Sequence, residues 1–236
     1  MATATSTDST DVDVRGCAEP GTAVTRSLLG YGVLAGPTYL VVGLAQALTR
    51  DGFDLRRHDL SLLANGTLGW IQIANLVVTG LATIAAAIGL SRALRGGRGG
   101  TWGPRLIGVY GTGLVAAGVF VADPMAGFPI GTPPGPPVAV SSHGILHVLS
   151  GAVGFLALVA ACFVIARGFA DRGQHPWAWY CRITGIVFLA GIAGISAGSG
   201  HPAAVLGLWI AVIAGWAWLS IVSAHLFATT AEVGSR

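Results

Sequence analysis

The chain has 236 residues, of which 53% are apolar and only 10% are charged, and its formal net charge is +3. A water-soluble domain carries about 25% charged residues, so this composition excludes an ordinary soluble protein and favours one whose solvent is the lipid bilayer. The net charge is small and divided among several loops, which also argues against nucleic acid as a partner.

Residues 1–24 are rich in Ala, Thr, Ser and Asp, and they predict a disordered polar tail. Six apolar runs follow, each close to the roughly 20 residues that cross a bilayer as a helix. They cover residues 27–49, 69–94, 104–122, 144–167, 179–198 and 203–227. The runs are continuous rather than alternating, which excludes a transmembrane barrel. We expect an all-α membrane protein, a six-transmembrane-helix bundle over residues 25–228, with a short tail at 229–236.

The basic residues divide unequally between the two sets of alternate segments, and all 13 of them are arginine. With the N-terminus inside, the cytoplasmic segments contain Arg15, Arg26, Arg92, Arg95, Arg98, Arg105, Arg167, Arg172, Arg182 and Arg236. The outer segments contain only Arg50, Arg56 and Arg57. Because cytoplasmic loops carry the excess of positive charge, we predict that both termini are cytoplasmic.

The second apolar run carries Gln72, Asn75, Thr79 and Thr83 at helical spacing. Lipid would penalise these polar side chains, so this face is expected to point into the bundle. We expect Gln72 and Asn75, with Trp70 near the start of the run, to line a substrate-binding approach.

The longest break after the first run is opened by Asp123 and closed by His143 and His147. Two histidines four residues apart share one helix face, which suits two ligands of one metal ion, and Asp123 could add a carboxylate. These three residues are the candidate catalytic and zinc-binding set. The predicted topology brings further candidates of second rank to the same membrane face, namely His58, Asp59, Ser61 and His201.

A zinc ion held in this way would lower the pKa of a bound water and hydrolyse an amide or ester bond of a lipid. The site would then be that of a membrane-embedded, metal-dependent hydrolase. The simpler interpretation is that the histidines hydrogen-bond lipid headgroups and loop carbonyls. Asp123 followed by Pro124 is also typical of a helix end.

Several motifs occur in the order found in a known family, namely His58–Leu63, Gly69–Asn75, Asp123–Pro133 and His143–His147. With these motifs the chain resembles, over about residues 28–227, the bacterial integral membrane family catalogued as domain of unknown function 998. The resemblance implies a multi-pass protein with six helices in the cytoplasmic membrane of a bacterium. It supplies no activity and no catalytic residues.

Two classes of function stay open at this point. The first is a polytopic membrane protein with a His- and Asp-rich outward-facing polar mouth, which acts on or binds a lipid or apolar small molecule. The alternative is a non-enzymatic protein for membrane binding or transport, or an assembly partner whose outer loops dock another protein. No charged residue lies at the centre of any apolar run, which argues against ion-coupled transport.

Overall fold

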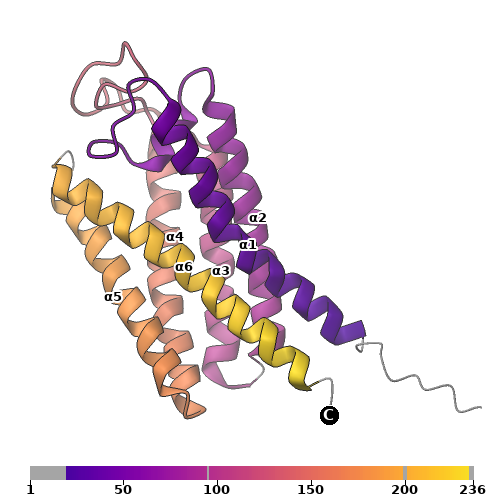
Figure 1. Cartoon of the computed structure of the whole chain (residues 1–236). Helices are drawn as coiled ribbons and strands as arrows, with labels where there is room; N and C mark the ends of the chain where they lie inside the picture. The colour runs from indigo at the N-terminus through magenta and orange to yellow at the C-terminus, as the bar shows by residue number, and fades with distance from the viewer. Residues whose placement is uncertain (1–19, 95, 199–200, 234–236) are drawn as a thin grey trace, which may run out of the picture.

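The computed structural model describes residues 20–94, 96–198 and 201–233 (Figure 1). Its elements are α1 (Pro20–Thr49), the short 3-10 helix η1 (Leu60–Ala64), α2 (Gly69–Ala93), α3 (Gly97–Val119), α4 (Ser142–Asp171), α5 (His175–Ala197) and α6 (Pro202–Val233). Within these ranges no β-strand forms, although Met125 and Phe128 make an isolated bridge. The expectation of an all-α protein is confirmed.

Several helices extend beyond the apolar runs. α1 begins at Pro20, so residues 20–24 of the expected tail are helical, and residues 1–19 lie outside the described part. α6 continues to Val233, so the expected C-terminal tail is helical up to that residue, and residues 234–236 are not described. Hydropathy indicates which residues suit lipid, whereas the backbone hydrogen bonds of a helix can continue past the membrane surface. Proline is also well tolerated in the first turn of a helix.

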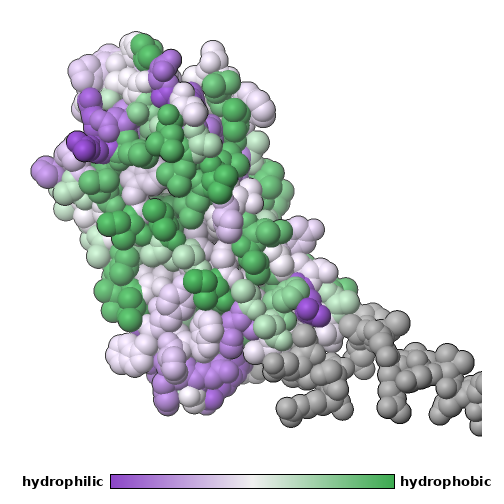
Figure 2. All heavy atoms as spheres, in the orientation of Figure 1, coloured by the Kyte–Doolittle hydropathy of each residue, from purple (hydrophilic) through white to green (hydrophobic). Residues whose placement is uncertain are grey.

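Five helices are long and apolar enough to cross a membrane, namely α1, α2, α4, α5 and α6. The third expected span, α3, is not among them. It begins seven residues before the apolar run (residue 97 rather than 104) and ends at Val119, and its first turns contain glycines and arginines. Figure 2 shows apolar side chains across the middle of the visible face and polar ones towards both ends. The chain is therefore a multi-pass membrane protein.

The helices pack as a ring in chain order. α2 packs between α1 and α3, α4 between α3 and α5, and α6 between α5 and α1, which closes the ring. α1 begins and α6 ends at the same end of the bundle (Figure 1). Residues 50–68 and 120–141 form long connections at the opposite end, which we call the loop end.

The polar face of α2 points into the bundle, as predicted. Gln72, Asn75, Thr79 and Thr83 are all buried. Gln46 of α1 donates to the side-chain oxygen of Gln72 at 3.0 Å, so two amides meet across the α1–α2 contact. The Asn75 amide donates to the backbone carbonyl of α1 at residue 39, at 3.1 Å. These bonds pair one polar atom of each of the three amides inside the bundle, where lipid could offer no partner.

Candidate functional site

A cavity of about 640 Å³ extends from the loop end into the middle of the bundle. We call it the loop-end cavity. Every helix and η1 contribute to its wall, which is mostly aliphatic and aromatic. Its aromatic lining consists of Tyr39, Tyr110, Phe155, Trp209 and Trp216.

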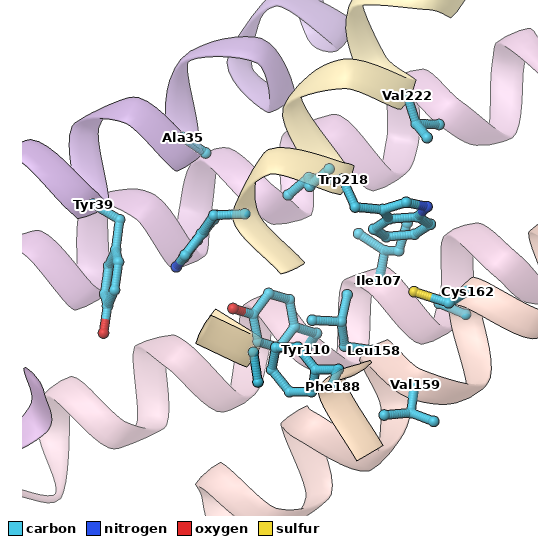
Figure 3. Packing of buried hydrophobic residues seen from close by; sticks show 14 of the residues in the cluster. Ala35, Tyr39, Ile107, Tyr110, Leu158, Val159, Cys162, Phe188, Trp218 and Val222 are labelled. Carbon is cyan, nitrogen blue, oxygen red and sulfur yellow. The ribbon is translucent and has the colours of Figure 1, made fainter. Parts of the chain in front are cut away.

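The inner part of the wall is a cluster of aromatic rings from three helices. The ring centroid of Trp216 lies 4.9 Å from that of Tyr39 and 5.8 Å from that of Tyr110. Both tyrosines belong to the buried core and are labelled in Figure 3. The Tyr110 phenol makes no hydrogen bond to any described residue, although it lines the cavity. An unpaired hydroxyl in an apolar wall can anchor the polar group of a ligand or a water.

Of the predicted site residues, the structure brings Asp59, Ser61, Asp123 and His147 to the wall of this cavity. Asp59 precedes η1 and caps it, because its Oδ1 accepts a hydrogen bond from the backbone N–H of Leu62 at 3.2 Å. The same oxygen accepts from the Ser61 hydroxyl at 2.7 Å. Asp59 Oδ2 has no hydrogen bond within the described part of the chain.

Asp123 connects the end of α3 to the start of α4. Its Oδ1 accepts from the Ser141 hydroxyl at 2.6 Å, and its Oδ2 accepts from the Ser141 backbone N–H at 2.9 Å. These two hydrogen bonds hold the pKa of the Asp123 carboxyl below its usual value. Gly144 makes this approach possible, because a Cβ at that position would overlap the carboxylate.

His147 is buried against the last turn of α3. Its Nδ1 lies 3.1 Å from the Ala117 carbonyl oxygen and 2.8 Å from the Phe120 carbonyl oxygen. A ring nitrogen facing two acceptors must be the protonated one, so Nε2 is the acceptor of the neutral imidazole. Among the described residues Nε2 has no hydrogen-bond partner. His143, the other member of the predicted pair, is exposed, and its ring lies 5.6 Å from that of Phe120.

The remaining candidates do not line the cavity. His58 is buried between the two long connections, where Nδ1 accepts from the Asp54 N–H at 2.9 Å and Nε2 donates to the Ala126 carbonyl at 3.0 Å. His201 is exposed at the start of α6. Gln72 and Asn75 are buried in the α1–α2 contact, and Trp70 is 65% exposed on the bundle surface.

The hypothesis of a zinc site requires at least three ligands close together. Among the described residues, no three of His, Cys, Asp and Glu lie together in a group that could hold a metal ion. The hypothesis that His143, His147 and Asp123 form a catalytic or metal site stays a prediction.

The aromatic wall is the part of the site that sequence reasoning missed. Tyr39, Tyr110 and Trp216 lie on different helices, and no spacing within one helix signals that they meet. Trp209 has a partial signal, since a tryptophan near a helix start suits the membrane interface. Its Nε1 donates to the His58 backbone carbonyl at 3.2 Å and so fastens α6 to the first connection.

Comparison with known proteins gives one match. A family model described as "Protein of unknown function (DUF998)" matches residues 33–225. No curated protein and no solved structure matches the chain.

Proposed function

The chain belongs to the DUF998 family, whose description names no function, and from the loop-end cavity we propose that the protein binds an amphiphilic lipid or apolar small molecule within the membrane. The hydrocarbon part of the ligand occupies the apolar wall, and its polar part reaches Asp59, Ser61, Asp123 and His147.

The cavity itself is the observation that carries this proposal. Its volume of about 640 Å³ lies within the range of roughly 300–1,000 Å³ that is typical of small-molecule sites. Such sites combine an apolar wall with a few convergent polar groups. Here the wall is built from all six helices, and the polar groups gather from two connections and the start of α4.

Part of the wall is open to the surface of α4. Ile145, Val148 and Leu149 line the cavity, and their side chains are 49%, 66% and 55% exposed. In a membrane protein, exposed apolar residues of a spanning helix face lipid. A ligand dissolved in the bilayer therefore has a direct lateral path to the cavity.

We further propose that α3 is a sixth span and that the loop end faces outwards from the cell membrane of a bacterium. α3 packs between α2 and α4 and runs from one end of the bundle to the other. Arg92, Arg105, Arg167 and Arg182 lie near the end opposite the loops, which the positive-inside rule assigns to the cytoplasm. Both termini are then cytoplasmic.

The binding proposal is tested by filling the cavity. Gly151 lines it, and a Cβ at this position meets no atom within 4 Å, so the Gly151→Phe side chain has open space there. Gly30 of α1 is a matched control, because its Cβ would also meet nothing within 4 Å and it does not line the cavity. Both replacements insert the same side chain into a spanning helix.

The measurement is native mass spectrometry of the full chain purified in a mild neutral detergent. We expect the wild type and Gly30→Phe to retain a bound lipid or apolar molecule after delipidation, and Gly151→Phe to lose most of it. Equal retention by all three proteins, or none by the wild type even when lipid extract is added back, would refute the proposal.

A further inference from the structure

We propose that the ligand of the loop-end cavity carries a cationic head group, such as an alkylammonium. This inference rests on the proposed function and names the chemical class of its ligand. Asp59 and Asp123 supply the negative charge, and the aromatic wall supplies ring faces that attract cations.

The charged groups in the wall have one sign. Asp59 and Asp123 line the cavity, and no arginine does so in the described part of the chain. Neither carboxylate forms an ion pair with a described residue, because their contacts are the hydrogen bonds to Ser61, Leu62 and Ser141. A like charge at this place costs free energy, so a phosphate or carboxylate head is disfavoured.

The arginine at the end of α1 is already engaged elsewhere. The Arg50 guanidinium donates to the backbone carbonyls of Leu63 and Asn65. Its central carbon also lies 5.0 Å from the centroid of the Phe128 ring. An anionic head group would have to compete with these contacts, and Arg50 does not line the cavity.

Near the loop end, the wall of the cavity offers two hydrogen-bond acceptors without a partner among the described residues. Asp59 Oδ2 and His147 Nε2 have no hydrogen bond among the described residues, and the Ser61 hydroxyl already donates to Asp59. His147 lines the cavity and is only 8% exposed, so its free acceptor is largely shielded from the surface. An ammonium head donates N–H bonds to such acceptors, whereas an anionic head brings only further acceptors.

The aromatic rings deeper in the cavity also favour a cationic head group. Trp216 packs against Tyr39 and Tyr110, and Asp59 lines the same cavity as these three rings. Aromatic rings that line a site are the means by which proteins recognise quaternary ammonium groups. A trimethylammonium head, which cannot donate N–H bonds, is therefore also accepted.

The test compares two probes of equal chain length, dodecyltrimethylammonium and dodecyl phosphate, below the concentrations at which they form micelles. Binding to the full chain in a neutral maltoside detergent is measured by thermophoresis. We expect the wild type to bind the cation at least about tenfold more tightly than the anion. Asp59→Asn should lower this ratio several-fold, and Asp123 accounts for the preference that remains.

The Asp59→Asn variant preserves the local fold, and Asp51→Asn is its matched control. Asparagine caps helices as well as aspartate does, so Asp59→Asn keeps the side-chain oxygen that η1 needs. Asp51→Asn removes one carboxylate from the same connection at an exposed position outside the cavity, and it should leave the ratio unchanged.

The outcomes separate the two proposals. If Gly151→Phe weakens binding of both probes but the wild type shows no preference for the cation, the cationic class is wrong and the binding site stands. A preference that Asp59→Asn and Asp51→Asn reduce equally would also overturn it, because the effect would then come from surface charge. If Gly151→Phe weakens neither probe, the binding proposal itself fails.

Discussion

His147 has a structural use that is separate from any ligand. The last carbonyls of a helix have no partner within it, and the His147 Nδ1–H donates to two of them at the end of α3. The side chain therefore holds α4 against α3, while its Nε2 stays without a partner among the described residues and the residue lines the cavity. The contribution of the Nδ1 hydrogen bonds to stability can be tested at this residue alone.

His147→Leu should destabilise the protein, whereas His147→Asn should not. Leucine keeps the bulk but leaves two buried carbonyls without a donor, which costs about 1–3 kcal/mol. For a chain of this size, about 2 kcal/mol corresponds to a fall in melting temperature of roughly 4–8 °C. The asparagine Nδ2 can take the place of the histidine Nδ1 and keep the bond.

The melting temperatures are compared by intrinsic fluorescence in the same detergent, so that only differences between variants are used. An asparagine variant that melts as low as the leucine variant would show that the Nδ1 contact is not what stabilises the α3–α4 contact.

Single residues show where sequence reasoning stops. The spacing of His143 and His147 indicated a shared helix face, yet one ring is exposed and the other buried, because α3 packs over only one of them. Asp123 followed by Pro124 suggested a helix end, yet α3 ends at Val119 and the carboxylate instead binds Ser141 at the start of α4. Tyr110 carried no signal, since its importance depends on Trp216, more than 100 positions later.

At the scale of elements, the junction between α3 and α4 depends on a glycine. Ser141 caps α4 by accepting from the Gly144 N–H at 3.0 Å, while its own hydroxyl donates to Asp123. The carboxylate lies against the first turn of α4, where the helix dipole favours negative charge. Any side chain at position 144 would push the carboxylate out of this place.

Gly144→Ala should therefore lower the melting temperature, although the same change usually stabilises a helix. At Gly207 of α6 a Cβ would meet no atom within 4 Å, so Gly207→Ala should gain the usual 0.5–1 kcal/mol or so. The opposite signs of the two changes identify the steric cause.

A double-mutant cycle supplies the control for this element. In an Asp123→Ala background the carboxylate is gone, and Gly144→Ala should no longer lower the melting temperature. If the alanine at 144 is equally harmful in both backgrounds, the overlap with Asp123 is not the reason.

The positions of the helices could be read from the sequence better than their ends. The polar stripe of α2 was predicted to be buried because lipid excludes it, and Gln72 and Thr83 are fully buried. The start of α1 and the end of α6 lie several residues beyond the predicted runs, since the turns there contain residues that suit either water or a helix.

At the scale of the whole molecule, the ring of helices explains why the cavity escapes prediction from sequence. Each helix touches its neighbours in the chain, and the space inside the ring is filled or left open according to side chains from all six. Apolar runs look alike whether they face lipid, a neighbour or a cavity. Hydropathy therefore predicts the membrane and the number of helices, but not which residues face one another.

The orientation proposed for the ring can be tested on α3, the helix whose apolarity falls short. Thr101 is exposed near the start of α3, and Pro134 is exposed in the connection that follows it. If α3 crosses the membrane with the loop end outside, Pro134→Cys reacts with a membrane-impermeant maleimide in intact cells. Thr101→Cys should react only after the cells are permeabilised.

Each cysteine is introduced singly into a chain in which Cys17 is replaced by serine, and the buried Cys162 and Cys181 are retained as internal references that should stay unlabelled in the folded protein. The reverse labelling pattern would invert the topology and place the cavity on the cytoplasmic side. Labelling of both positions from the same side would show that α3 does not cross the membrane, because α3 is the helix that separates residue 101 from residue 134 in the chain. The arginine distribution favours labelling of Pro134→Cys from outside. Arg105 lies about one helical turn after Thr101, and the positive-inside rule places this end of α3 in the cytoplasm.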